Sequence, residues 1–366
     1  ELKWLKAETY VFTPSKVMED MKKSAASITV VTDRQIRQMG AKDLADALDR
    51  AVPGLSTYYY YTTFRTISVR GSYGLSSNNV LLMVNGHSVN QEFLGGSFIY
   101  DRLTVDNIKR IEVIRGPGSA LYGANAFYGV INVITKEAED IDGLELLARG
   151  GSYDTQQYNL LYGKTFNDLE VAFNLNYFKT HGFRGHIEED LQTYYDQLGG
   201  TNASLAPGDM QGDDEKYDIA LNLKYKGLKF DGRFVNRDRD YPVGWIPVLS
   251  NHSTASPKDY YLNLSYERTL WERLDLFAKV YRNHNFIRSN IQVYPPGINL
   301  PTPFGYAVFP DGTMGISEIK NNKTGIEMQA TYRMTESNTL VAGAIYEEAK
   351  AYDAKFKANF RETPLG

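Results

Sequence analysis

The 366-residue chain contains no cysteine, which excludes disulfide bridges and thiolate metal sites. It also lacks long apolar runs. The longest one near its start, Val80 to Val84, is far short of the roughly 20 residues that a membrane-spanning helix needs. A formal net charge of -4, with no run of lysine or arginine, argues against nucleic-acid binding. Any passage through a membrane must therefore use β-strands.

Aromatic residues are abundant, at 13% of the chain, and tyrosine (27) outnumbers phenylalanine (17). This excess suits the aromatic girdles of a membrane β-barrel, but it also suits an extracellular β-protein or one that binds carbohydrate. The hydrophobic fraction of 42% would equally support a soluble core. Composition alone therefore leaves membrane and soluble β-proteins open.

The most distinctive stretch, Asn107 to Lys136, predicts a strand, a glycine-rich turn, a short helix and a second strand. A dinucleotide fingerprint is excluded because Leu121 stands where its third glycine belongs and a strand, not a long helix, follows. Gly163-Lys164-Thr165 imitates the end of a phosphate-binding loop, but Tyr158 replaces the first glycine in a strand-like setting. Neither motif supports nucleotide binding.

Two strings carry a family resemblance. RIEVIRGPGSALYGANAFYGVINVITK resembles the closing segment of the plug domain of TonB-dependent outer-membrane receptors, and DLADALDRAVPGLS resembles the opening half of that plug. The resemblance covers residues 27–136. It implies a periplasmic segment over 1–26, an α+β plug domain over 27–138, and antiparallel transmembrane β-barrel strands over 144–366.

The plug itself shows ordinary element signals. Strands are expected at 27–32, 64–70 and 80–84, helices at 33–39 and 43–51, and a hairpin at Asn85-Gly86.

From Leu144 onward apolar and polar residues alternate with a period of two, as in a strand with one lipid face and one wet face, although a soluble sandwich alternates too. Short and long connections also alternate after the first hairpin, which favours an outer-membrane barrel. The nine expected strands cover residues 144–151, 155–166, 169–180, 216–226, 228–240, 258–269, 273–288, 319–334 and 337–352.

The expected strand count does not fit the expected plug. Nine strands would end on the outer side, and a tenth could use Phe356, Ala358 and Phe360. A barrel of about ten strands has room for side chains or one small ligand, whereas plugged transporters have about 22 strands. We therefore expect the chain to be the N-terminal part of a longer receptor, with an incomplete barrel.

The resemblance places substrate-binding loops of the plug at two aromatic segments. Four consecutive tyrosines cannot all be buried on one strand, so some should be exposed to a large planar or amphipathic ligand. The alternative is that these aromatics pack against the barrel wall. The candidate ligand-binding residues are Tyr58, Tyr59, Tyr60, Tyr61, Phe93, Phe98 and Tyr100.

Two further sets of residues follow from the resemblance. Glu8, Thr9, Tyr10, Val11, Phe12 and Thr13 lie where the family has its TonB box or its neighbour, a strand-forming peptide that adds to the sheet edge of TonB. An ordinary disordered tail is the alternative.

Arg70, Glu112 and Arg115 are expected to lock plug to barrel, because plug arginines of the family face barrel carboxylates. Such buried ion pairs would hold the plug in register with the barrel. They would remain breakable, because the cost of desolvation offsets much of their attraction. Arg115→Ala should then loosen the plug and increase antibiotic leakage.

The five histidines are too scattered for a linear metal motif. His181 and His186 share one long connection, where a haem or metal contact is weighed against solvated side chains. Asp209, Asp213 and Asp214 are calcium candidates, because the resembling cobalamin receptors bind calcium there, although an EF-hand spacing is absent. No cofactor is expected.

The predicted function is uptake of a large scarce ligand across the outer membrane of a Gram-negative bacterium. An iron–siderophore complex is the first choice, followed by cobalamin or haem. The partners would be TonB with its inner-membrane energising complex, outer-membrane lipid and the metal chelate. A surface docking protein without TonB-driven transport is the alternative. An enzyme is not expected, since there is no Gly-x-Ser-x-Gly elbow.

Overall fold

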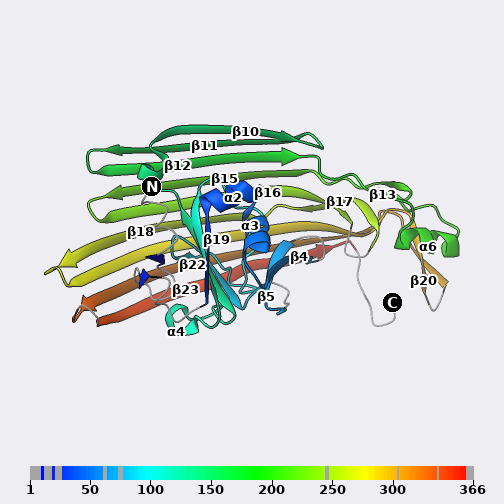
Figure 1. The fold of residues 1–366 in the computed structure, drawn as a ribbon. Helices are drawn as coiled ribbons and strands as arrows, with labels where there is room; N and C mark the ends of the chain where they lie inside the picture. The colour runs from blue at the N-terminus through cyan, green and yellow to red at the C-terminus, as the bar shows by residue number, and fades with distance from the viewer. Residues whose placement is uncertain are drawn as a thin grey trace.

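The computed structural model describes residues 10–11, 19–20, 27–60, 64–72, 77–243, 247–302, 305–335 and 338–359. It consists of a mixed α+β plug followed by an antiparallel sheet of long strands, and Figure 1 shows this sheet lying along one side of the plug. In the described part of the chain, no helix is both long enough and apolar enough to cross a membrane.

The plug is organised around a five-stranded sheet with the order β3-β8-β9-β6-β7. Only β6 and β9 are parallel, and the connection between them carries the loop 89–107 and β8. A separate hairpin, β4–β5, stands beside the sheet. The elements are β3 (Ile28–Thr32), α2 (Asp33–Met39), α3 (Leu44–Ala51), β4 (Leu55–Tyr60), β5 (Phe64–Val69), β6 (Val80–Val84), β7 (His87–Ser88), β8 (Ile108–Arg115), α4 (Ser119–Tyr122), β9 (Gly129–Thr135) and α5 (Ala138–Ile141).

The two longer plug helices, α2 and α3, begin at side-chain caps that the sequence contains. Thr32 and Gln35 form a capping box at the start of α2, and Asp43 accepts a hydrogen bond from the Asp46 backbone N–H at the start of α3. Gly40 ends α2 in the left-handed conformation, with φ of 63°. These confirmed starts set α3 with its leucine edge toward the sheet.

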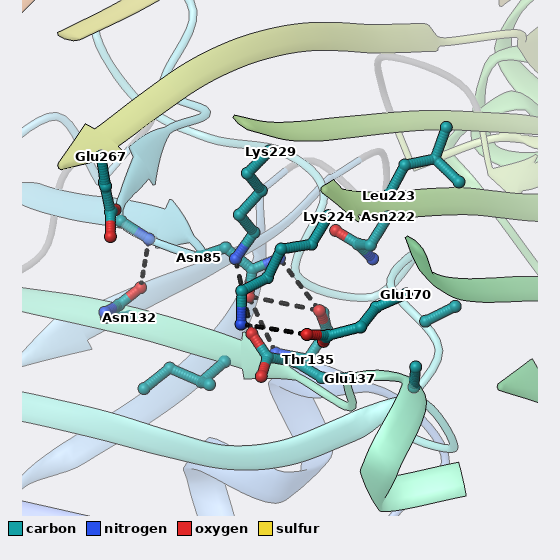
Figure 2. A pocket seen from close by; sticks show the side chains of 14 residues that line it. Asn85, Asn132, Thr135, Glu137, Glu170, Asn222, Leu223, Lys224, Lys229 and Glu267 are labelled. Atoms are coloured by element: carbon teal, nitrogen blue, oxygen red, sulfur yellow. Dashed lines mark hydrogen bonds and ion pairs between the residues drawn. The ribbon is translucent and has the colours of Figure 1, made fainter. Parts of the chain in front are cut away.

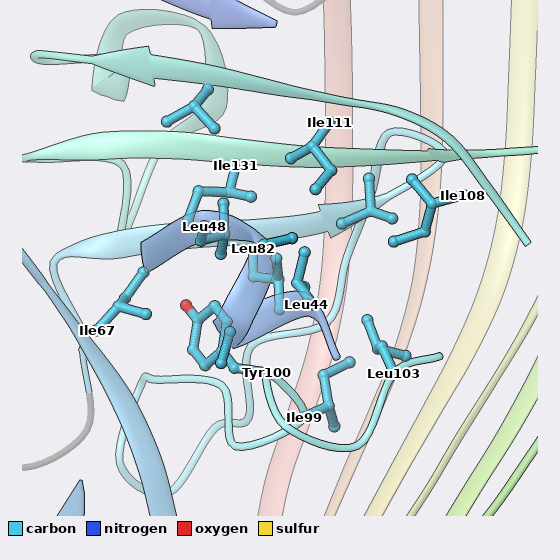
Figure 3. Close-up of a cluster of buried hydrophobic side chains, with 14 of the residues drawn as sticks. Leu44, Leu48, Ile67, Leu82, Ile99, Tyr100, Leu103, Ile108, Ile111 and Ile131 are labelled. Atoms are coloured by element: carbon cyan, nitrogen blue, oxygen red, sulfur yellow. The ribbon is translucent and has the colours of Figure 1, made fainter. Parts of the chain in front are cut away.

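The core of the plug is apolar and lies between α3 and the sheet. Leu44, Leu48, Leu82 and Ile131 are fully buried there, and Figure 3 shows them converging from helix and strands. Burying one such side chain contributes roughly 1.5–3 kcal/mol. The same cluster also includes Val235 and Tyr261 of the long sheet, so the apolar core extends to the wall.

The glycine-rich turn 116–118 reverses the chain so that β8 and β9 can pair antiparallel. Gly129 begins β9 so close to β8 that a Cβ atom there would lie 2.7 Å from the Ile114 carbonyl oxygen. The glycines of this stretch therefore serve strand pairing.

The long sheet has ten strands and runs β10-β11-β12-β15-β16-β17-β19-β22-β23, with β18 between β16 and β19 over their inner halves. All neighbours are antiparallel, and β10 and β23 are its edges. The strands are β10 (Gly143–Gly151), β11 (Thr155–Phe166), β12 (Leu169–Thr180), β15 (Asp214–Tyr225), β16 (Leu228–Val243), β17 (Leu249–Ala255), β18 (Lys258–Leu270), β19 (Leu274–Tyr294), β22 (Thr313–Arg333) and β23 (Thr339–Ala358).

All nine strands expected from the alternation are present, and β11 and β12 have the predicted bounds. The tenth strand expected from Phe356 and Ala358 is wrong, because both residues extend β23; Phe360 lies outside the described residues. The sequence prediction also missed six outer elements: β13 (His186–Ile187), α6 (Leu191–Gly199), β14 (Gly208–Asp209), β17, β20 (Ile298–Thr302) and β21 (Gly305–Phe309).

Gly163, which resembles part of a phosphate-binding loop in the sequence, has a structural role in packing. A Cβ atom at this position would lie 2.6 Å from the Ile141 side chain and 2.7 Å from the Ala138 carbonyl oxygen. Because Gly163 has no side chain, α5 can pack directly against β11. The end of the plug is therefore in close contact with the first strands of the wall.

Candidate functional site

The hairpin β4–β5 carries the tyrosine cluster toward the end of the sheet where the long connections lie (Figure 1). Val52-Pro53-Gly54 ends α3 and turns the chain, with φ of 76° at Gly54. Tyr59 pairs across the hairpin with Arg65 and is 50% exposed, whereas Tyr58 is half-buried. The outermost described aromatic ring of this hairpin therefore faces the space above the plug.

Two guanidinium groups lie against the Tyr59 ring. The Cζ atom of Arg65 is 5.9 Å and that of Arg239 5.4 Å from the ring centroid, and Arg239 also lies 5.7 Å from the centroid of Tyr241. Both distances fall within the range of a cation–π contact. The Nη1 atom of Arg239 is buried without a hydrogen-bond acceptor in the described part of the chain. The wall strand β16 thus completes a site that begins on the plug.

A carboxylate network supports this site from below. Asp101 of the plug accepts from Arg237 of β16 at 2.6 Å, and Asp214 of β15 accepts from the same guanidinium at 2.5 Å. Burial is the largest single effect and would raise the pKa of Asp101, but the charge and hydrogen bond of Arg237, together with the charges of Arg239 and Lys216, outweigh it and hold the pKa below its usual range. Asp101 therefore stays ionised and fixes Arg237, leaving Arg239 with only a 4.0 Å approach to that carboxylate.

The other predicted ligand-binding aromatics are distributed differently. Phe93 is 54% exposed, but Phe98 and Tyr100 are buried in the plug, Tyr100 completely, and Figure 3 shows Tyr100 inside the core. Tyr100 belongs to the core beside α3, and neither buried side chain is exposed to a ligand, which corrects the prediction for them. The Tyr60 side chain and Tyr61 lie outside the described residues.

The predicted lock residues Arg70 and Arg115 bond within the plug. Arg115 donates to the Pro53 carbonyl at 3.1 Å, and the Nη2 atom of Arg70 lies 3.5 Å from the Arg115 carbonyl. Neither forms an ion pair with a carboxylate of the described wall strands. In this structure they tie the turn after α3 to the end of β8, which corrects the expected contact with the wall.

Glu112 is also an internal residue of the plug. It is fully buried on β8 and accepts from the Arg110 Nε atom at 2.9 Å. This ion pair lies within one strand of the plug, so it does not join plug to wall as the motif predicted.

The contacts that join plug to wall come from a loop that the sequence analysis treated only as a ligand loop. Between residues 85 and 106 the plug sends polar groups to seven strands of the wall. The ion pairs are Glu92 with Lys323, Asp101 with Arg237, Arg102 with Asp259, and Asp106 with Arg149. The Thr104 backbone N–H adds a hydrogen bond of 2.8 Å to Asp218.

His87 makes the most enclosed of these contacts. Its Nε2 atom lies 2.6 Å from the Asn283 side-chain oxygen, and its ring packs against Tyr261 and Tyr281 at centroid distances of 5.2 and 4.9 Å. Burial, followed by the charge of Lys279, lowers the pKa of His87 to about 3. The ring is therefore neutral at physiological pH and donates its hydrogen bond to the wall.

The predicted TonB-contact segment is described only in part. Tyr10–Val11 form strand β1, which pairs antiparallel with Glu19–Asp20 (β2). Glu8, Thr9, Phe12 and Thr13 lie outside the described residues.

The three calcium candidates each have a partner side chain within the chain. Asp209 lies 2.6 Å from His186 Nδ1, Asp213 lies 2.9 Å from His181 Nδ1, and Asp214 binds Arg237. Across the described residues, no cluster of three or more histidine or acidic side chains has the geometry of a metal site. Neither the predicted calcium site nor the haem contact considered for His181 and His186 is therefore supported. The two histidine–aspartate pairs instead connect the two ends of the loop that contains α6.

Comparison with known proteins agrees with this arrangement. A family model described as the TonB-dependent Receptor Plug Domain matches residues 20–130. Residues 20–130 thus belong to the TonB-dependent receptor plug family, and the strands that follow have the fold of part of the β-barrel of such receptors. Receptors of this kind lie in the outer membrane of Gram-negative bacteria, and this chain is placed there with them.

The receptor has relatives among characterised transporters. It is 36% identical over 150 residues to the vitamin B12 transporter BtuB of Vibrio vulnificus, a match that covers 41% of this chain and 24% of the relative. The BtuB of Photobacterium profundum is 34% identical over 146 residues, covering 40% and 23%. The matched region is thus about a quarter of the length of these relatives.

Solved structures show the same fold over most of the chain. The pyoverdine receptor FpvA of Pseudomonas aeruginosa PAO1 superposes with a TM-score of 0.67 at 14% identity, covering 98% of this chain and 52% of its own. The ferric-catecholate import receptor Fiu of E. coli K12 gives 0.65 at 14% identity, covering 93% and 52%. The chain therefore spans about half the length of the receptors that it resembles.

Proposed function

We propose that this receptor takes up a large, scarce ligand by TonB-dependent transport, and that the ligand is an iron–siderophore complex, with cobalamin or haem as the next choices. The observation that carries this proposal is a plug held beside membrane-spanning strands by polar contacts, with an aromatic and cationic face toward the outside. We assign residues 1–26 to TonB coupling, 27–138 to the plug and 144–366 to the barrel wall.

The outer face favours a ligand with negative charge and flat groups. Tyr59 offers an exposed ring, and Arg65 and Arg239 place positive charge against that ring. A ferric catecholate combines oxygen anions with aromatic rings, and both features find a counterpart here. The named relatives are transporters of vitamin B12, whereas the structural neighbours include siderophore receptors, so the ligand has to be decided by experiment.

The partner that supplies energy is proposed to be TonB. The short ladder between β1 and β2 demonstrates that Tyr10–Val11 can adopt the extended form that strand addition requires. Transport by this route needs movement of the plug and no covalent chemistry, and the named relatives are transporters and receptors.

Uptake measured with three labelled probes tests the proposal: a ferric tris-catecholate, haem and cyanocobalamin. Cells carrying the full-length receptor should take up one of them only when TonB is present. Deleting residues 8–13 should abolish uptake and leave binding unchanged. Energy-dependent uptake by the deletion variant would reject the assignment of this segment.

The alternative is a surface docking protein on the same fold. Such a protein would bind its partner equally well in cells with and without TonB and would import none of the three probes. Equal results in the two strains would therefore favour docking.

A further inference from the structure

Charge on the described wall is concentrated on two strands. Along β15 and β16 the side chains that face the plug include six cations and only three carboxylates, whereas the buried middles of β11, β12 and β18 present uncharged groups such as Asn159, Asn174 and Asn263. The six cations are Lys216, Lys224, Lys229, Arg233, Arg237 and Arg239, and the carboxylates are Asp214, Asp218 and Asp231.

These cations form a line along the two strands, which Asp231 interrupts on β16 and in which Arg233 is paired with Asp218 of β15. Arg239 and Lys229 are ten residues apart on one strand, which corresponds to roughly 33 Å and thus to the thickness of the hydrocarbon core. At the outer end Arg239 contacts Tyr59 of the proposed ligand site. The line therefore begins where the ligand is proposed to bind.

A cavity lies at the inner end of the same two strands. It has a volume of about 420 Å³ and is bordered by plug residues Asn85, Asn132 and Glu137 and by wall residues Lys224 and Lys229. Figure 2 shows Lys224 directed at Glu170 and Lys229 directed at Glu137, with N–O distances of 3.4 and 3.6 Å. These contacts are long and partly solvated, so they are weak.

The plug covers the line with a few polar groups. Its Asp101 neutralises Arg237, its Glu137 lies against Lys229, and its Asn85 donates to Asp231 at 3.2 Å. The wall supplies too few carboxylates of its own, and the buried Nη1 atoms of Arg233 and Arg239 have no acceptor in the described part of the chain. Withdrawal of these plug segments would leave an excess of positive charge with donors directed into the gap.

We propose that the ligand of this receptor is an anion and that it crosses between the plug and the β15–β16 wall, passing along the cations from Arg239 to Lys229 and leaving through the cavity. Each step replaces a plug carboxylate or an empty donor position with an oxygen anion of the ligand. The proposal rests on the proposed transport function and adds the charge of the ligand and its route.

Thiol labelling in energised cells tests the route in the full-length receptor, with any cysteine outside these 366 residues replaced by serine, because the 366 residues contain none. Ala220 is 3% exposed and faces the plug among the cations of β15, whereas Asn159 is 4% exposed on the uncharged wall of β11. During TonB-dependent uptake, Ala220→Cys should react at least about five times faster with an anionic methanethiosulfonate than with a cationic one. Asn159→Cys should react slowly with both.

The outcomes separate the two proposals. If neither the ferric tris-catecholate, nor haem, nor cyanocobalamin is taken up, the transport function is wrong and the route falls with it. If a probe is taken up while Ala220→Cys stays inert or prefers the cationic reagent, the route alone is wrong. If uncharged cyanocobalamin is the only probe taken up, the proposal that the ligand is an anion is wrong.

A second pair of variants tests the line of cations without a thiol. Lys229→Gln should slow uptake of the anionic probe about fivefold and leave its affinity unchanged, because the binding site is about 33 Å away. Lys226→Gln is the matched control, since Lys226 sits in the neighbouring turn and pairs with Asp168 away from the plug. Equal uptake rates of the two variants would overturn the role of Lys229.

Discussion

The interior of the plug and the surface between plug and wall are both buried, but they contain different side chains. Inside the plug, Leu48, Leu82 and Ile131 are apolar and fully enclosed. Between plug and wall, Arg102, Asp101 and His87 are equally enclosed but polar or charged. Apolar contacts add stability in proportion to area, whereas buried ion pairs recover little more than their desolvation cost. The plug can therefore stay folded while it separates from the wall.

The largest expected effect is in the apolar interior. Leu82→Ala should lower the free energy of unfolding of the plug by about 4 kcal/mol, because it removes a fully buried side chain from β6, an inner strand of the plug sheet. Denaturant titration of the purified receptor measures this loss. Leu121→Ala, at a side chain that is 44% exposed, is the control and should change stability by less than about 1 kcal/mol. A similar loss of stability for Leu82→Ala and Leu121→Ala would show that the buried apolar side chains do not dominate the stability of the plug.

The next effect is at an ion pair of the interface. Arg102→Ala leaves the Asp259 carboxylate without its partner and should cost about 3 kcal/mol, the lower end of the range because Asp259 is 16% exposed. The double variant Arg102→Met, Asp259→Leu should regain most of this loss. Protease resistance of the plug and entry of a large antibiotic into cells report the change. A double variant as weak as the single one would show that the pair itself, and not the stranded charge, holds the plug.

Acid should loosen the interface through His87. The folded pKa of about 3 lies below the ordinary value of 6.5, so the unfolded or undocked ring binds more protons between these values. Stability is complete above pH 6.5 and falls by up to about 1.4 kcal/mol per pH unit as the pH drops toward 3. The charges of Lys279 and Lys323 act in the same direction. Plug release followed from pH 7 to pH 4.5 should show this slope, and His87→Gln should flatten it.

The smallest effect is expected at Arg115. Its hydrogen bond to the Pro53 carbonyl is internal to the plug, so Arg115→Ala should cost about 1 kcal/mol and leave antibiotic entry unchanged. This outcome differs from the leakage that the sequence predicts for a lock residue. Increased antibiotic leakage would instead support the predicted role of Arg115 in holding the plug to the barrel. The polar interface would then include this side of the plug.

Strand alternation in the sequence was a reliable guide to the wall. Because lipid-facing and plug-facing residues alternate, β11 and β12 could be bounded correctly from their side chains alone. The outer strands β17 and β20 lack this alternation in their sequences, LSNHSTA and INLPT, and β20 includes Pro301. Helix α6 did carry signals, with Asp190 capping its start and Gly200 ending it in the left-handed conformation.

The candidate site was predictable only from its plug side. The tyrosine run identified the hairpin, because four successive rings cannot all be buried. Arg239 could not be found in the same way, since it belongs to a strand about 180 residues further on and meets Tyr59 only in the folded molecule. Tyr100 was misassigned because an aromatic residue in a loop without regular structure can still complete a core.

The length of β19 and β22 bears on what an approaching molecule meets first. Each has 21 residues, and they pair along almost their whole length. Such strands extend for about 70 Å, or about 50 Å along the membrane normal at a tilt near 40°, whereas the apolar band is only about 25 Å tall. Much of the sheet therefore stands outside the membrane as a stiff wall. An antibody or bacteriophage would encounter a fixed surface there, and a substitution near the outer rim would change its recognition without altering the spanning part.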